Sequence, residues 1–341
     1  MNDKKQINSI VIPDLELNPI IETSKYGNIR QDNVINALSL ISSRTVANID
    51  DITGTGLIDI TSGVTSIEIM IQKYSNTTLK QSTSKLLTLF DMEFTQNGAN
   101  KTDIAIPLKD VADILGLKNI NKARESIKKD LEALYNISLE AKRDYGGKTD
   151  YIKFRICEAQ GIAKGIVCFK FTDAIANHLR KGNIMPVPYK LLQIESNSNK
   201  NPYAYPLGLK ITQHMKMNQF NKTKKEKNAT CIISVVKLLE VCQNYGMPTY
   251  EQIATGSRRL EEQIVKPLER DLDACSAIFK WDYCKAKGEL LTDEELENRT
   301  YKEYIKRFIK VTYPEDYPRE EYDTKKARKS EKEDKKKNKV A

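Results

Sequence analysis

The stretch IAIPLKDVADILGLKNINKARESIKKDLEALYN, residues 104–136, contains the pattern that decides the fold of the first half of the chain. A short strand over Ile104–Ile106 is followed by Pro107, a residue that the first turn of a helix tolerates. Gly116 is placed to close that helix at its C-terminal end. The apolar positions between them share one helical face: Leu108, Val111, Ala112 and Leu115.

A second, longer helix is expected after a turn at residues 117–119. Two helices joined by so short a turn predict a helix-turn-helix. The apolar side of the second helix consists of Ile120, Ala123, Ile127, Leu131 and Leu134. The opposite side, at the same helical spacing, consists of Lys118, Asn121, Lys122, Glu125 and Lys129.

A β-hairpin is expected directly after this helix pair, because residues 137–143 and 151–156 alternate between apolar and polar around a turn at 144–147. Such a hairpin, or wing, separates winged-helix proteins from other helix-turn-helix proteins. A strand over 165–171 and a helix over 172–180 complete the unit.

The second half of the chain repeats this order of elements. A helix from Tyr203 to about Met217, a brief strand at Ile232 and Ile233 and a helix over 235–242 come first. The sequence Thr249 to Gln252 fits a capping box that starts a helix, and Gly256 marks the following turn. A second wing is expected along 277–284 and 301–313, around a polar stretch at 285–299.

The helix that begins at Ser257 is the recognition helix of this second unit. Pro267 should kink it, since proline removes the hydrogen bond to the carbonyl of Gln263. Its buried residues are expected to be Leu260, Ile264, Leu268 and Leu272. The residues on its other face are expected to be Thr255, Arg258, Arg259, Glu262, Lys266 and Arg270.

These patterns predict an α+β protein of two tandem winged-helix domains, over 64–194 and 203–313, joined by a polar linker at 195–202. A flexible, loosely ordered N-terminal arm covers 1–60, and a disordered lysine-rich tail covers 314–341. The net charge is +9, yet residues 1–60 carry −3, so the rest of the chain is strongly basic. That charge suits a polyanionic partner such as DNA, although a basic surface that only keeps the protein soluble explains it equally well.

Several other classes are disfavoured. Six cysteines without a C-x-x-C pair, and only two histidines, argue against zinc, and no cofactor is expected. The start lacks a signal peptide and no apolar run could span a membrane, which predicts a cytoplasmic protein with free thiols. His178 and His214 are far apart, so the paired-histidine motif of rolling-circle initiators is missing and no enzymatic activity is expected. The string Gly146 to Thr149 is no P-loop, because Lys142 stands where that motif needs glycine.

The segment SRRLEEQIVKPLERDL, residues 257–272, followed by the strand AIFKWDY, 277–283, resembles the second winged helix of the theta-type plasmid replication initiators, or Rep proteins. That family has a basic helix with an Arg-Arg pair and a Val-Lys-Pro triplet before an aromatic strand. Residues 104–140 resemble the first domain of the same family. The long insertion in the second wing, the long N-terminal arm and the lysine tail depart from the family and leave the subfamily open.

The resemblance implies binding to directly repeated origin sites (iterons), opening of nearby A·T-rich duplex and recruitment of host replication initiation or helicase-loading proteins. It also implies a homodimer that represses its own promoter. A winged-helix transcriptional repressor or partition-type regulator is the alternative, and a DNA-processing enzyme is a third.

Candidate DNA contacts follow from the chemistry of base edges and phosphates. Arginine donates two hydrogen bonds to guanine and asparagine pairs with adenine, whereas phosphate contacts fix register only. The two recognition helices are expected in successive major grooves, roughly 34 Å apart. In the first domain the candidates are Asn121, Lys122, Arg124, Lys128, Lys129, Arg143 and Lys148. In the second they are Thr255, Ser257, Arg258, Arg259, Lys266, Arg270 and Lys280. For both helices, and for both hairpins, an ordinary solvated polar face remains the alternative.

Overall fold

The structure is a computed structural model that describes residues 25–31, 55–62, 65–72, 80–145, 148–197, 199–221, 226–253, 257–297 and 300–319. The chain divides into two compact units, Met1–Pro206 with Cys242–Met247, and Leu207–Val241 with Pro248–Ala341. Helices and small antiparallel sheets make up both units, so the fold is mixed α+β as predicted. The stretch predicted as a linker, 195–202, lies within the first unit. Most of the predicted arm and tail falls outside the described residues. The predicted tail begins at residue 314, but Tyr317 is buried against Tyr313, so the expectation of disorder is wrong for residues 314–319.

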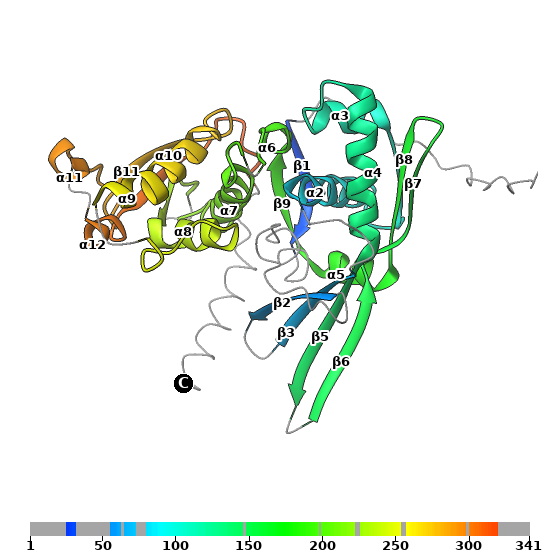
Figure 1. The fold of residues 1–341 in the computed structure, drawn as a ribbon. Helices are drawn as coiled ribbons and strands as arrows, with labels where there is room; N and C mark the ends of the chain where they lie inside the picture. Colours follow the sequence, from blue (N-terminus) through cyan, green and yellow to red (C-terminus); the bar gives the residue numbers. More distant parts are fainter. Residues whose placement is uncertain are drawn as a thin grey trace, which may run out of the picture. The chain divides into compact units, whose positions relative to one another are not determined.

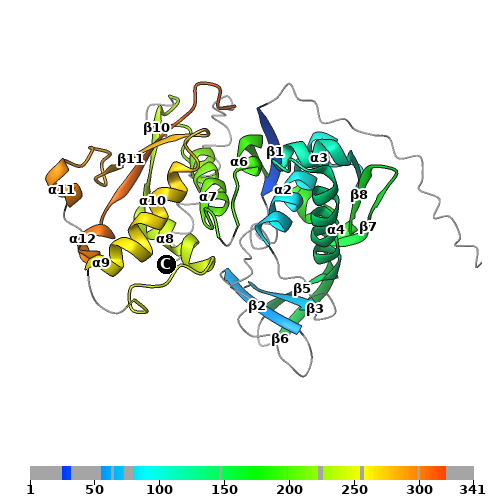
Figure 2. The ribbon, with the colours of Figure 1, turned by 45° about the horizontal axis from the view of Figure 1, so that its top comes forward.

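Helix α2 (Gln81–Gln96) is the centre of the first unit, and Figure 1 and Figure 2 both draw it between β1 and α4. Residues on every side of this helix are buried, which is the pattern of a core helix rather than a surface helix. Phe90 stacks on Phe169 with ring centroids 4.3 Å apart, and Phe169 meets Phe171 edge to face at 4.9 Å. These aromatic rings join α2 to strand β8 (Ile166–Phe171), which carries Phe169 and Phe171.

The strand and the two helices predicted over 104–136 are present. They are β4 (Asp103–Pro107), α3 (Leu108–Ile114) and α4 (Ile120–Asn136). Gly116 closes α3 as expected: its φ is +70°, and a Cβ there would lie 3.0 Å from the carbonyl oxygen of Gln193. The apolar side of α4 is buried except for Ile120, the first residue of the helix, which is 45% exposed.

The predicted hairpin after α4 exists, but its strands are not in the same sheet as β4, the strand that precedes α3. Its strands β5 (Ile137–Tyr145) and β6 (Lys148–Arg155) join β2 (Thr55–Ser62) and β3 (Thr65–Gln72) in the order β2-β3-β5-β6. Strand β4 instead pairs with β8 (Ile166–Phe171), which pairs with β7 (Cys157–Ala163). Figure 1 shows the two sheets on separate sides of the unit. Alternation in a sequence identifies a strand but not its partner, and β7, with Glu158, Gln160 and Gly161, alternates too weakly to be predicted.

Two parts of the predicted loose arm are strands. Residues Tyr26–Gln31 form β1, which pairs antiparallel with β9 (Asn183–Pro188), and β2 begins at Thr55. The expectation of a loosely ordered segment is therefore wrong for residues 26–31 and 55–60. Helices α5 (Asp173–Lys181) and α6 (Tyr189–Gln193) flank β9. Strand β1 runs close to α2, since a Cβ on Gly27 would lie 2.6 Å from the sulfur of Met92.

A buried carboxylate fastens β1 to α2. Both carboxylate oxygens of Asp91 accept a hydrogen bond from the backbone N–H of Arg30, at 3.2 and 3.1 Å, and Thr95 Oγ1 donates at 3.2 Å. Asp91 is 1% exposed, and burial raises its pKa from the ordinary value of 3.8 to about 7. Burial also raises the pKa of Glu93 to about 7.

Asp91→Asn is expected to reduce the pH dependence of stability. Between about pH 4 and pH 7 the folded chain keeps a proton that the unfolded chain has released, so the free energy of unfolding falls as pH rises through this window. The variant removes the contribution of Asp91 and leaves that of Glu93. Urea unfolding at about pH 5 and pH 8 measures the change. Asp113→Asn, at an exposed site on α3, is the control, and an unchanged pH dependence in Asp91→Asn would contradict the assignment.

The second unit contains most of α7 (Ala204–Met217) and α8 (Val235–Asn244), and strands β10 (Thr230–Ser234), β11 (Lys280–Cys284) and β12 (Phe308–Thr312). Its sheet has the order β10-β12-β11, so the strand before the helix pair contacts the last strand of its sheet, as in β4-β8-β7. Helix α11 (Asp293–Glu297) lies in the polar stretch predicted at 285–299. The returning strand predicted over 301–313 is shorter than expected, because α12 (Tyr301–Tyr304) precedes β12. The predicted capping box at 249–252 forms only a turn among the described residues, with Gln252 Oε1 accepting from the Thr249 N–H at 2.9 Å.

The predicted recognition helix of this unit is interrupted by a wide turn. It consists of α9 (Ser257–Leu260), the π-helical turn η1 (Glu261–Val265) and α10 (Lys266–Asp273), with Pro267 in the first turn of α10. Leu260, Ile264, Leu268 and Leu272 are all buried, as predicted. A spacing of four residues drifts by about 40° per step on an α-helix, and one π-helical turn compensates for most of this drift. The disruption expected at Pro267 is therefore present as a widened turn just before it.

Candidate nucleic-acid interface

Helix α4 presents a cationic face to solvent. The predicted contacts Asn121, Lys122, Arg124, Lys128 and Lys129 are all exposed, while Ala123, Ile127 and Leu131 are buried beneath them. In the part of the chain that the structure describes, the four cations have no hydrogen-bond or ion-pair partner on their side chains. Their charges are therefore available to an external anion.

The start of α4 is held by a side-chain cap. Asn119 Oδ1 accepts hydrogen bonds from the backbone N–H groups of Asn121 and Lys122, both at 3.1 Å. The cap fixes the turn of the helix that carries the first predicted base contacts.

Asn119→Ala is expected to lower the free energy of unfolding by about 1 kcal/mol, because two backbone donors lose their acceptor. Asn119→Ser, which restores an acceptor, should recover most of the loss. Urea unfolding of the three proteins measures the difference. Equal stability of the alanine and serine variants would show that the cap contributes nothing.

The hairpin residues predicted as contacts in the first unit lie in a different sheet from β4. Arg143 lies on β5 opposite Asp150, and Lys148 begins β6 opposite Tyr145, so both belong to the four-stranded sheet. The hairpin that joins β4 turns instead at Lys164, which is exposed and has a φ of 51°. Lys164 is not among the contacts predicted from the sequence, although the pair Lys164-Gly165 is typical of a tight turn.

The second unit places its predicted contacts along α9 and α10. Ser257, Arg258 and Arg259 form the start of α9, whereas Thr255 lies outside the described residues. Arg259 and Lys266 are exposed, and within the described residues neither side chain has a hydrogen-bond or ion-pair partner. The π-helical turn between them offsets Arg259 from Lys266 by about 100° relative to a continuous α-helix, so the two do not share one narrow stripe.

Arg270 is partly committed within the chain. Its Nε donates to Asp271 Oδ1 at 2.7 Å, and the Asp271 side chain is fully buried whereas that of Arg270 is half exposed. A phosphate contact by Arg270 would have to share the guanidinium with this carboxylate. Lys266 is therefore the freer of the two cations predicted to contact phosphate on α10.

The aromatic strand after α10 is part of the packing of the unit. Phe279 is buried, and Trp281 meets Tyr283 edge to face with centroids 5.2 Å apart. Trp281 Nε1 also donates to Asp273 Oδ1 at 3.1 Å. Lys280, at the start of β11, is exposed beside this strand and remains accessible to an external partner.

Comparisons with known proteins find likeness in structure but not in sequence. The chain is similar in structure to domains 2 and 3 of RctB. The crystal structure of the selenomethionine derivative of these domains matches with a TM-score of 0.44 and 12% identity, over 81% of this chain and 97% of that chain. A second crystal structure of RctB domains 2 and 3 matches with a TM-score of 0.41 and 10% identity, over 80% and 96%. No family model and no curated protein matches the sequence.

The described residues contain no group of three or more histidine, cysteine or acidic residues arranged to hold a metal ion. None of the described helices is both long and apolar enough to cross a bilayer. The ring nitrogen Nε2 of His214 lies 2.7 Å from the carbonyl oxygen of Ile232, a contact that ties α7 to β10.

Proposed function

We propose that this chain is a sequence-specific double-stranded DNA-binding protein that initiates replication of a plasmid or related mobile element, and that it is not an enzyme. Each unit would be a winged-helix domain. The observation that carries the proposal is the repeated arrangement of the two units: each has a strand, a helix pair and a hairpin. The two three-stranded sheets, β4-β8-β7 and β10-β12-β11, have the same strand order. In both units the second helix of the pair presents cations that have no partner among the described residues.

In this proposal, α4 and the helix from Ser257 lie in successive major grooves of one duplex, about one helical turn apart. Arg258, Arg259 and Asn121 read base edges, and Lys128, Lys129 and Lys266 neutralise phosphates. Lys164 replaces Arg143 and Lys148 as the hairpin contact of the first unit, because it lies at the tip of the hairpin that joins β4. Several phosphate contacts would make the affinity fall steeply with salt.

The resemblance of residues 257–283 to Rep proteins favours an initiator over a repressor or partition-type regulator. It extends the proposal to directly repeated origin sites, host initiation or helicase-loading proteins and a homodimeric form.

Origin complementation tests the proposal. The gene supplied in trans should maintain a replicon that carries the DNA flanking the gene. A chain that represses a promoter in this DNA but does not maintain the replicon is a regulator. Cleavage of the same DNA in a nicking assay with Mg²⁺ would instead indicate an enzyme.

A further inference from the structure

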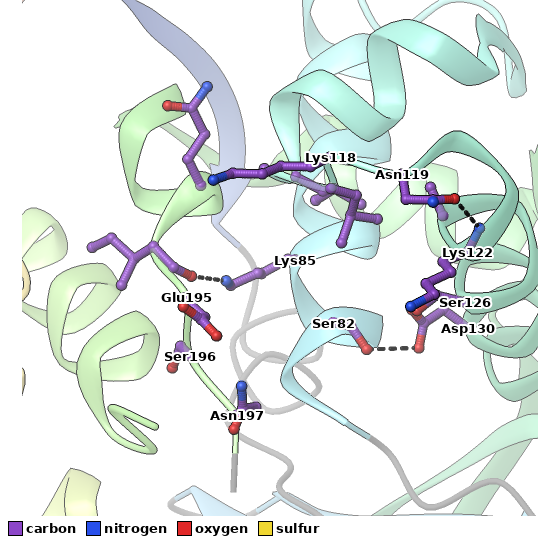
Figure 3. A pocket seen from close by; sticks show the side chains of 16 residues that line it. Ser82, Lys85, Lys118, Asn119, Lys122, Ser126, Asp130, Glu195, Ser196 and Asn197 are labelled. Carbon is purple, nitrogen blue, oxygen red and sulfur yellow. Dashed lines mark hydrogen bonds between the residues drawn. The ribbon is translucent and has the colours of Figure 1, made fainter. Parts of the chain in front are cut away.

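A cavity of about 660 Å³ lies beside the turn of the first helix-turn-helix. Its walls are the first turns of α2, the turn between α3 and α4, the start of α4, and residues 193–197 (Figure 3). Small-molecule sites in proteins have volumes of roughly 300–1,000 Å³, so the space is larger than a single anion needs.

Three lysines from different elements surround this cavity. Figure 3 shows Lys85 on α2, Lys118 in the turn and Lys122 on α4 around one space. Lys85 Nζ donates to the carbonyl oxygen of Ile194, which commits part of its hydrogen-bonding capacity. Lys118 and Lys122 are exposed, and neither ammonium group has a hydrogen-bond or ion-pair partner among the described residues.

The two carboxylates of the cavity already have partners. Asp130 Oδ1 accepts from Ser82 Oγ at 2.9 Å and from Thr83 Oγ1 at 2.7 Å, and the side chain is buried. Glu195 lies 2.5 Å from Lys200 Nζ. The groups left to a ligand are therefore mainly donors: the ammonium groups of Lys118 and Lys122, with Ser126 and Asn197 beside them.

We infer that this cavity binds a small ligand bearing a phosphate group. Phosphate oxygens accept several hydrogen bonds and attract lysine ammonium groups, which matches the donors present. Asn119, which caps α4, and Lys122, in its first turn, both line the cavity, so an occupant would contact the start of the helix proposed to contact DNA. Ligand binding in the cavity does not depend on the proposed function. Only an effect of the ligand on DNA affinity would rest on it.

Calorimetric titration of the full chain with inorganic phosphate, adenosine monophosphate and adenosine diphosphate tests the inference. Lys118→Gln removes a charge, and Ser126→Phe fills the space without changing charge. Each should weaken binding of the best probe by about tenfold or more, because Lys118→Gln removes a charged hydrogen bond and Ser126→Phe occupies the space that the ligand needs. Lys109→Gln, at an exposed site on neighbouring α3, is the matched control and should bind the probe as the wild type does. Circular dichroism checks that each variant is folded.

Binding of duplex DNA by the same proteins distinguishes the sources of phosphate. If no free probe binds, but Lys118→Gln and Ser126→Phe weaken DNA binding about tenfold and Lys109→Gln does not, the phosphate belongs to the DNA backbone. Equal losses in Lys109→Gln and Lys118→Gln would overturn the inference. So would the absence of any effect of Ser126→Phe on free probes and DNA alike. If the chain binds a nucleotide in the cavity but does not bind DNA, the proposed function is refuted and the inference about the cavity stands.

Discussion

Replacing Arg258 and Arg259 together by alanine is expected to weaken binding to the DNA that flanks the gene by about 100-fold. A bidentate contact between arginine and guanine contributes about 1–3 kcal/mol of discrimination, and two such contacts are lost. The preference over unrelated duplex should fall with the affinity. Titration of labelled specific and unrelated duplexes with both proteins, at one fixed salt concentration, measures both quantities.

Two control variants separate base reading from charge. Arg258→Lys with Arg259→Lys keeps the charge but removes the planar donor pair, so it should lose sequence preference and keep most of the salt dependence. Lys210→Ala with Lys310→Ala removes two charges from residues that are not candidate contacts and should bind nearly as the wild type does. If the double alanine variant kept wild-type preference, the helix from Ser257 would not be the reading element.

Phe169→Ala is expected to destabilise the first unit by about 3–5 kcal/mol, the usual loss for a phenylalanine removed from a well-packed core. Phe169 is 2% exposed and contacts the rings of both Phe90 and Phe171. Urea unfolding followed by circular dichroism should therefore begin at a much lower denaturant concentration than in the wild type.

Trp281 provides an internal control for this variant. It is the single tryptophan of the chain and belongs to the second unit, so its fluorescence reports on that unit. Since each unit has its own core, the fluorescence transition of Phe169→Ala should stay near that of the wild type. Phe169→Leu should recover a large part of the loss. A destabilisation below about 1 kcal/mol would mean that the three rings do not form the core described.

The helix pair of the first unit could be predicted because every local signal agrees there. Pro107, the spacing of Leu108 and Val111, and Gly116 each indicate the same helix boundaries. The hairpin partner could not be predicted, because it depends on pairing between distant segments. Residues 137–156 alternate more clearly than 157–163, although the latter contribute the strand that pairs with β8.

The packing inside the first unit could not be predicted from the sequence either. Helix α2 buries polar residues that would be assigned to a surface, and each needs a partner from elsewhere in the chain. Thr88 meets the hydroxyl of Tyr205 at 2.7 Å, and Asp91 binds the backbone of Arg30. Strand β1 is fastened in place by this last contact, which no periodicity near residue 26 could indicate.

The sequence of the interrupted helix in the second unit contains a signal that predicts the interruption. Four buried residues recur at a spacing of four, from Leu260 to Leu272, which is longer than an α-helical turn. Read together with Pro267, that spacing indicates a widened turn. In α4 the last interval, from Leu131 to Leu134, is three residues, and the helix is continuous.

The central claim is that two helices of one chain contact adjacent grooves of one duplex. Hydroxyl-radical footprinting of the full chain on the DNA flanking the gene tests it most directly. The account predicts two protected patches per site, about 10 base pairs apart on one face of the duplex, in sites repeated in the same orientation. A single patch per site, or no protection at salt concentrations where the chain remains folded, would contradict it.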